Sequence, residues 1–373
     1  MLHVLILGGY GNFGSILSQS LAEVDNIRLT LAGRSQDKAQ RFITQYLQHA
    51  QQPIHSAVID AHAADLGTQL KALSPDLLIH TSGPFQGQNY HVAESCIRAG
   101  IHYIDLADAR EFVHDFRRLD ALAKAHNVLA ISGASTLPGL SSAVLAHFQP
   151  QFKKITQLEY AITLANQSER GEATVKSILS YTGKPFTTLI NGAMREVMGW
   201  QSLHQTRFSA PLGKRWLANC DVPDLSLFPE AYPSLQTQRF YAGLELSMMH
   251  VGLWGLSWLV RLGLIANLAR FSRPIIWLSK QLMSLGSANS GMMLRLSGRG
   301  LDDQPLSIRW DLVAQSNHGL RIPITPALIL TRKMADGQLT LRGAMPCMQL
   351  ITLVEFTNAV AHTQIEQSVS DNQ

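Results

Sequence analysis

The strongest constraint on this sequence is an alternation of short apolar runs with helix-length segments over its first 145 residues. The apolar runs, each with Gly, Pro, Ser or Asp at or near its end, are residues 2–7, 27–32, 54–59, 76–81, 102–106 and 127–132. Helix-length segments lie between them, near residues 12–24, 36–50, 62–73, 89–99 and 110–125. Strands joined by helical crossovers form a parallel sheet that is covered on both faces. We therefore predict a doubly wound α/β fold with its ligand at the carboxyl ends of the strands.

A glycine-rich loop follows the first apolar run. It has the pattern G-x-G-x-x-G at Gly9, Gly11 and Gly14, directly after a strand and at the start of a helix. In that context Gly9 permits a tight turn, Gly11 lets backbone amides approach a pyrophosphate, and Gly14 lets the helix pack on the sheet. The phosphates would lie at the positive helix N-terminus, so we predict dinucleotide binding here. The loop residues expected to contact the cofactor as well are Tyr10, Asn12 and Phe13.

The end of the second apolar run indicates which dinucleotide binds. A carboxylate at this position would hold the ribose 2′-hydroxyl of NAD, but this chain has Arg34 followed by Ser35. A guanidinium with a neighbouring hydroxyl matches the 2′-phosphate of NADP, which an acid would repel. NADP is therefore the predicted cofactor. In the alternative, Arg34 is a solvated strand-end residue and Asp37 serves the ribose.

Loops after the later runs contain the remaining candidates. Asp60 either meets the adenine amino group or caps a helix beginning near His62. A Gly-Pro turn brings the backbone close without a bulky side chain, so Ser82, Gly83 and Pro84 are expected beneath the nicotinamide ribose, the alternative being a rigid turn only. For proton transfer the first choice is Asp108, although acids that open a helix more often act as caps. Other groups at these strand ends are Asp105, Glu111, Ser135 and Thr136.

Composition excludes several classes of protein. Charged residues make up 16% of the chain and hydrophobic residues 46%, which is unlike a disordered chain. The three cysteines lie far apart and the histidines show no metal-ligand spacing, so neither a disulfide framework nor a metal site is predicted. The chain starts without the pattern of a secretory signal, and its first 200 residues contain no basic cluster with interleaved aromatics. We expect a cytoplasmic protein with no nucleic-acid partner.

The segment near residues 241–290 differs in composition from the rest. After Glu245 it contains no acid, and its longest charge-free run, 246–260, is fifteen residues, too short to span a bilayer. Its tryptophans and its bases up to residue 285 are Trp254, Trp258, Trp277, Arg261, Arg270, Arg273 and Lys280. Two alternatives follow. The segment packs on the chain's own core or on a second subunit of a homodimer, or it lies on an anionic surface at the inner face of the membrane.

Several motifs go beyond a general dinucleotide-binding pattern. They are Leu31 to Ser35, Ser82-Gly83-Pro84-Phe85, and the segments 93–106 and 133–142. In combination they resemble the saccharopine dehydrogenase-like family of NADP-binding oxidoreductases, and residues 343–347 with the apolar segment up to 361 resemble the family's end. The resemblance implies an N-terminal Rossmann domain, a second α/β domain with a mixed sheet, and a substrate cleft between them. It does not imply saccharopine as the substrate.

The expected domains are an NADP-binding Rossmann domain over 1–145, a second α/β domain over 146–345 with an apolar helical insertion, and a C-terminal helix and frayed tail over 346–373. Strand-like runs near 155–165, 292–297 and 306–314 support the second domain. The resemblance implies NADP(H)-dependent hydride transfer to a small or lipid-linked substrate. The alternative is a catalytically silent NADP-binding protein that docks on a membrane or a partner.

Overall fold

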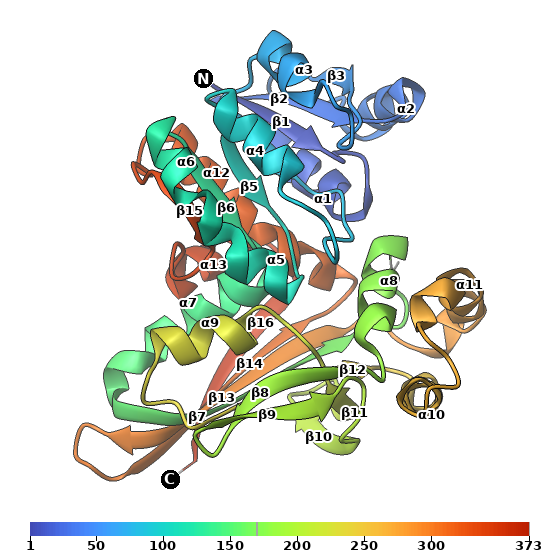
Figure 1. The fold of residues 1–373 in the computed structure, drawn as a ribbon, viewed down its shortest axis with the longest axis vertical. Coiled ribbons are helices and arrows are strands. Elements are labelled where there is room, and N and C mark those ends of the chain that lie inside the picture. The colour runs from blue at the N-terminus through green and yellow to red at the C-terminus, as the bar shows by residue number, and fades with distance from the viewer. Residues whose placement is uncertain (169–170, 373) are drawn as a thin grey trace. The chain divides into compact units, whose positions relative to one another are not determined.

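The structure is a computed structural model that describes residues 1–168 and 171–372 (Figure 1). The chain forms two compact units. The first unit consists of Met1–Leu140 and Leu320–Ala359, and the second of Ser141–Gly319 and Val360–Gln373. Each unit is therefore built from one long segment and one short segment of the chain, and the short segments follow one another at the C-terminal end.

The first unit contains a seven-stranded sheet in the order β15-β6-β5-β4-β1-β2-β3. Its strands, all paired in parallel, are β1 (Leu2–Leu7), β2 (Ile27–Gly33), β3 (His55–Val58), β4 (Leu77–His80), β5 (His102–Asp105), β6 (Leu129–Ser132) and β15 (Gly343–Pro346). The six predicted strands and the doubly wound sheet are confirmed. Strands covered on both faces are mostly apolar, and accordingly β4, which contains Leu77, Leu78 and Ile79, is buried along its whole length.

Helices cover both faces of this sheet (Figure 1). They are α1 (Asn12–Ala22), α2 (Gln36–Tyr46), α3 (Leu66–Leu73), α4 (His91–Arg98), α5 (Arg110–Asp115), α6 (Asp120–Ala125), α12 (Thr325–Ala335) and α13 (Leu353–Ala359). The helix expected near 110–125 is divided into α5 and α6 by a 3₁₀ turn at Phe116–Leu119. On one face α3, α4 and α6 pack in a row, and on the other α1 packs with α12.

The C-terminal part of the chain differs from the expected arrangement. It rejoins the first unit at Leu320, ahead of the expected boundary at residue 345, because α12 carries the chain to β15 for parallel pairing with β6. After α13 the chain does not fray. Residues Ile365–Asn372 form strand β16, which pairs antiparallel with β14 (Pro305–Ala314). Backbone hydrogen bonds along β14 thus order a segment whose polar composition predicted a loose tail.

The second unit contains a seven-stranded mixed sheet in the order β10-β11-β12-β7-β13-β14-β16, which confirms the predicted mixed sheet. Its other strands are β7 (Phe152–Leu164), β10 (His204–Phe208), β11 (Gly213–Asn219), β12 (Thr237–Leu244) and β13 (Ser290–Gly300). Only β12 and β7 pair in parallel among the pairs of this sheet that the structure describes. A separate antiparallel pair joins β8 (Pro185–Ile190) to β9 (Ala193–Met198).

The helices of the second unit are α7 (Ser141–Phe148), α8 (Glu172–Tyr181), α9 (Asp224–Ala231), α10 (Ser247–Arg261) and α11 (Ser272–Gln281). The last two lie within the basic, tryptophan-containing segment, with short 3₁₀ turns at Leu268–Phe271 and Met283–Leu285. Among the described residues no helix is long and apolar enough to cross a membrane.

A buried carboxylate, Asp224 at the start of α9, lies in the core of the second unit. Its Oδ2 accepts a hydrogen bond from the Ser141 hydroxyl at 2.6 Å, and its backbone oxygen accepts one from Gln238 Nε2 at 2.9 Å. Burial raises the pKa of Asp224 from 3.8 to about 7, while the hydrogen bond from Ser141 opposes the rise. The folded protein therefore favours the protonated acid up to near-neutral pH.

We predict that Asp224→Asn changes how stability depends on pH. Because the pKa of Asp224 is higher in the folded state, folding takes up a proton and the parent loses stability as the pH rises from about 4 to about 7. The difference in the free energy of unfolding, variant minus parent, should therefore increase by about 2 to 3 kcal/mol between about pH 5 and pH 8, as measured by urea denaturation. Asp303→Asn, at an exposed acid, is the control. Equal pH profiles for Asp224→Asn and the parent would contradict the prediction.

Candidate functional site

The glycine-rich loop lies where the strand order of the first sheet reverses, because β1 pairs with both β2 and β4. Gly8 has φ +90°, in the left-handed region that favours glycine, and its carbonyl oxygen accepts a hydrogen bond from the Gly11 N–H at 2.8 Å. From the end of β4, the hydroxyls of Thr81 and Ser82 donate to the Leu7 carbonyl at 3.0 and 3.2 Å. These bonds hold the loops after β1 and β4 against each other.

The three motif glycines meet different constraints. A Cβ added at Gly14 would overlap the Gly8 carbonyl oxygen, and one at Gly9 would lie 3.0 Å from Leu31 Cδ2. At the exposed Gly11 an added Cβ would meet only the Gly8 oxygen, at 3.1 Å, so the loop is open on this side. First-turn N–H groups have no partner within their helix. In α1 they belong to Asn12, Phe13 and Gly14. This open cradle of donors fits a pyrophosphate.

Tyr10 links the glycine-rich loop to the end of β2. Its hydroxyl accepts a hydrogen bond from the Ser35 N–H at 3.0 Å, and a Cβ added at Gly33 would overlap it. The Ser35 hydroxyl accepts a bond from the Lys38 N–H at 3.3 Å and thereby caps α2. The Arg34 side chain is exposed and forms no hydrogen bond or ion pair with a described residue. Its guanidinium is therefore free to meet a ligand, next to a backbone that Tyr10 holds.

Two acids follow β2 and β3. Asp37 lies in the first turn of α2 and is exposed. Asp60 is also exposed, and its Oδ1 accepts a hydrogen bond from the His62 N–H at 3.0 Å. Because α3 begins only at Leu66, Asp60 stabilises a turn and does not cap a helix near His62 as one alternative predicted. An ionised carboxylate has further acceptor sites, so Asp60 retains the capacity to bind an amino group.

The loop after β4 is held by a glutamine that the sequence motifs do not identify. Gln88 Nε2 donates to the Ser82 carbonyl at 3.2 Å and to the Pro84 carbonyl at 2.6 Å. The Ser82 hydroxyl lies beside the glycine-rich loop, since a Cβ added at Gly8 would come within 2.5 Å of it. The structure thus brings Ser82, Gly83 and Pro84 next to the predicted phosphate cradle.

Asp108 follows β5 and is exposed. Its Oδ1 accepts a hydrogen bond at 3.2 Å from Nε2 of Gln86, a residue of the loop after β4. The residue at the cap position of α5 is Ala109, which makes no side-chain cap. Through this hydrogen bond Asp108 joins two loops at the carboxyl edge of the sheet.

Asp105, the last residue of β5, is fully buried. Its Oδ1 accepts hydrogen bonds from the Ala107 N–H at 3.0 Å, the Ser132 hydroxyl at 3.0 Å and the Gly133 N–H at 2.8 Å. Burial raises the pKa of Asp105 to about 6, and the bonds from the backbone N–H groups and Ser132 oppose the rise. Its contacts fasten the ends of β5 and β6, so its role is to organise these loops.

The remaining candidates are dispersed. Glu111 is exposed in the first turn of α5, Ser135 is buried, and Thr136 begins the turn that precedes α7. Cys96 and Cys347 are buried, and burial raises the pKa of both thiols, which is typical of inert packing residues. In the part of the chain that the structure describes, no group of three or more His, Cys, Asp or Glu is arranged to hold a metal ion.

Comparisons with known proteins find a similar domain and similar folds. The model of the saccharopine dehydrogenase NADP binding domain matches residues 4–131. The apo histidine-tagged saccharopine dehydrogenase (L-Glu forming) from Saccharomyces cerevisiae has a TM-score of 0.68 at 13% sequence identity, covering 99% of this chain and 100% of that chain. A probable dehydrogenase from Thermotoga maritima has a TM-score of 0.48 at 8% identity, covering 96% of this chain and 93% of that chain. No curated protein sequence matches this one.

The matched residues extend from β1 through β6 and contain the glycine-rich loop, the end of β2 and the loops after β4 and β5. The likeness to the yeast enzyme extends over both units and shows a shared fold. Residues 4–131 of the first unit match an NADP-binding domain, in agreement with the dinucleotide binding that the glycine-rich loop predicted and with NADP as the predicted cofactor. Residues 4–131 therefore resemble the NADP-binding domain of the saccharopine dehydrogenase-like family, and the chain shares the fold of the yeast enzyme.

Proposed function

We propose that this chain is an NADP(H)-dependent oxidoreductase that transfers hydride between the cofactor and a small or lipid-linked substrate. The observation that carries the proposal is the phosphate cradle at Gly11, open to a ligand and located inside the matched NADP-binding domain. NADPH supplies the hydride when it is bound. The chain supplies backbone N–H donors for the pyrophosphate and Arg34 for the 2′-phosphate. Ser82, Gly83 and Pro84 form the floor beneath the nicotinamide ribose, and Asp60 accepts from the adenine amino group.

Asp108 is our candidate proton donor. It is exposed beside the loop after β4, where Gln86 orients its carboxyl group through the 3.2 Å hydrogen bond. Asp105 is fully buried and already bonded to three donors, which leaves Asp108 the better placed of the two carboxyl groups to reach a substrate. A single positioned proton donor next to the hydride acceptor suffices for carbonyl or imine reduction.

A second candidate function is an NADP-binding protein without turnover that docks on a membrane or a partner. The exposed apolar and basic helices of the second unit favour this alternative. Turnover separates the two candidates, because both of them bind NADPH and only the oxidoreductase consumes it.

The first prediction for this site is that Gly11→Val abolishes NADPH binding and leaves the fold intact. A side chain at Gly11 meets open space except for the Gly8 oxygen, so it fills the cradle without disturbing the core. NADPH should raise the melting temperature of the parent and of the control Gly67→Val, where an added Cβ meets no atom within 4 Å. Equal stabilisation of Gly11→Val by NADPH would contradict the placement of the phosphates.

A second prediction is that NADPH binds at least about tenfold more tightly than NADH, a difference of about 1.4 kcal/mol. Arg34→Ala should remove most of this preference by weakening NADPH binding far more than NADH binding. Calorimetric titration of both cofactors measures the ratio. Arg28→Ala, at an exposed arginine of β2, the strand that Arg34 follows, should leave the ratio unchanged. If the parent binds both cofactors equally, Arg34 does not select NADP.

The third prediction concerns turnover. The chain should oxidise NADPH in the presence of at least one compound from a panel of carbonyl, imine and enoyl substrates, as followed by loss of NADPH absorbance. With that compound, Asp108→Asn should lower kcat by about a hundredfold while NADPH affinity stays unchanged. Glu111→Gln, at an exposed acid in the next turn, is the matched control. Tight NADPH binding without oxidation by any compound would favour the silent alternative.

A further inference from the structure

Exposed large hydrophobic side chains are concentrated in one segment of the second unit, residues 246–285. Elsewhere in the described chain such side chains are scattered singly. Those within the segment are Met248, Val251, Trp258, Leu262, Leu264, Phe271, Trp277, Leu278 and Leu285. Trp277 is 64% exposed, although a large aromatic side chain is normally well buried. Exposed apolar side chains concentrated in this way mark a site of interaction.

Each helix of this segment has an inner face and an outer face. On the inner side, Leu253 and Val260 of α10 and Ile275 of α11 pack against Val175 and Leu179 of α8. Figure 1 shows α10 and α11 beside α8 at one edge of the second unit. The expectation that the segment packs on the chain's own core therefore holds for its inner face.

The outer face of α10 is apolar and exposed. Met248, Val251, Trp258 and Leu262 recur at helical spacing, so they form one stripe along the helix. A helix that turns an apolar stripe to solvent while its opposite side packs on the protein has a second partner to bind. Trp277 and Leu278 extend the exposed apolar surface onto α11.

The charges on this surface are positive. Arg261, Arg270, Arg273 and Lys280 are all exposed, and residues 246–300 contain no acid. The Arg261 guanidinium lies 4.9 Å from the centre of the Trp258 ring. From the neighbouring α8, Glu172 lies 3.9 Å from Arg273, and it also pairs with Lys176. Among the described residues named here, the one acid, Glu172, lies near more bases than it can neutralise, so their net charge is positive.

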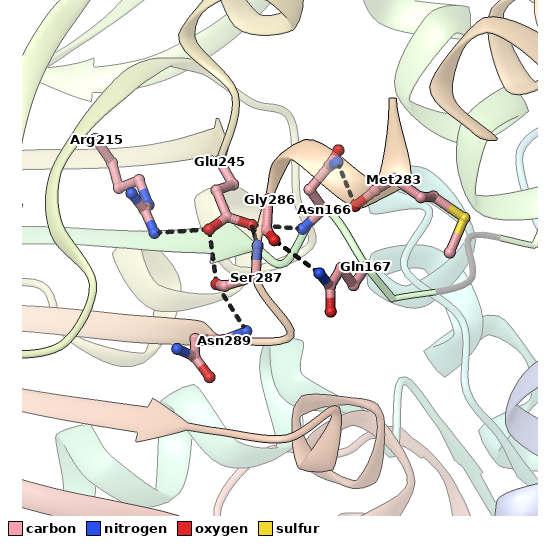
Figure 2. Close-up of polar contacts among 8 residues, drawn as sticks. All are labelled: Asn166, Gln167, Arg215, Glu245, Met283, Gly286, Ser287 and Asn289. Atoms are coloured by element: carbon pink, nitrogen blue, oxygen red, sulfur yellow. Dashed lines mark hydrogen bonds and ion pairs between the residues drawn. The ribbon is translucent and has the colours of Figure 1, made fainter. Parts of the chain in front are cut away.

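The carboxylate of Glu245 links the two ends of this segment (Figure 2). Glu245 precedes α10, and its Oε2 accepts hydrogen bonds from the N–H groups of Asn166 at 2.8 Å and Ser287 at 2.9 Å, while Oε1 accepts from the Ser287 hydroxyl at 2.6 Å. Arg215 lies 3.4 Å from the same oxygen. Asn166 Nδ2 also donates to the Leu282 carbonyl at 2.6 Å. These bonds hold both ends of the 246–285 segment against the strands of the sheet. The outer face of its helices is therefore a fixed surface.

We propose that the outer face of residues 246–285 docks on an anionic lipid bilayer. Tryptophan and leucine side chains enter the boundary between headgroups and acyl chains, while arginine and lysine meet the phosphates. A second copy of this chain fits less well, because a two-fold interface would oppose the same cations to one another. The docking surface does not involve the NADP-binding unit, so it stands whether or not the chain transfers hydride.

The test is co-sedimentation of the full chain, without cofactor, with vesicles of phosphatidylcholine alone or with added phosphatidylglycerol. The parent should bind the anionic vesicles and be released as salt is raised. Trp277→Ser with Leu278→Ser, and separately Arg270→Glu with Lys280→Glu, should each weaken binding at least about tenfold. Met194→Ser with Lys214→Glu, at exposed positions elsewhere in the second unit, is the matched control. The melting temperature of every variant without cofactor should equal that of the parent, which shows that the second unit is folded.

Three outcomes would overturn the proposal. The first is that the parent does not bind anionic vesicles at low salt, or binds neutral vesicles equally well. The second is that the control variant loses binding as much as the two variants within residues 270–280 do, which would place the lipid surface elsewhere. The third is a parent that dimerises in analytical ultracentrifugation and fails to bind vesicles, with Trp277→Ser and Leu278→Ser restoring the monomer. In that case a second copy covers the face.

Discussion

The parallel pairing of β1 with both β2 and β4 is the constraint on which the rest of the first unit depends. It brings the carboxyl ends of these strands together at the point where the strand order reverses. The N-terminus of α1, the exposed Arg34 and the loop at Ser82 then lie along one edge. No single element contains this site. Helical crossovers deliver each loop to the same edge because parallel strands require them.

Three carboxylates show how acids are accommodated away from water in this protein. Asp105 and Asp224 are fully buried with raised pKa values, and each accepts hydrogen bonds that offset part of the cost of burial. Glu245, which is partly buried, accepts from two backbone N–H groups and a hydroxyl beside Arg215. Each carboxyl group joins segments distant in sequence, so these acids organise the fold around surfaces whose own residues are free to meet ligands.

Those parts of the cofactor site whose residues are close together in the sequence could be predicted. Gly11 and Gly14 are three residues apart and act on one turn, and Arg34 directly follows a strand, so their neighbours in sequence reveal their environment. The contacts of Tyr10 and Asp108 are different in kind. Tyr10 reaches Ser35 across twenty-five positions, and Asp108 pairs with Gln86 across twenty-two. No spacing rule reports such contacts, because they depend on which strands are neighbours in the sheet.

Local periodicity and composition were enough to predict the six alternating strands, the glycine-rich turn and the basic, apolar character of the 246–285 segment. The place of the C-terminal strands depended on tertiary contacts. Gly343–Pro346 and Ile365–Asn372 are strands in two different sheets, although one is very short and the other is polar. The structure likewise decided which faces of α10 and α11 are covered. The physical reason is the same in both cases. The pairing of an edge strand depends on the backbone beside it, and the burial of a helix face depends on the side chains packed against it. Neither partner can be read from the pattern of the segment itself.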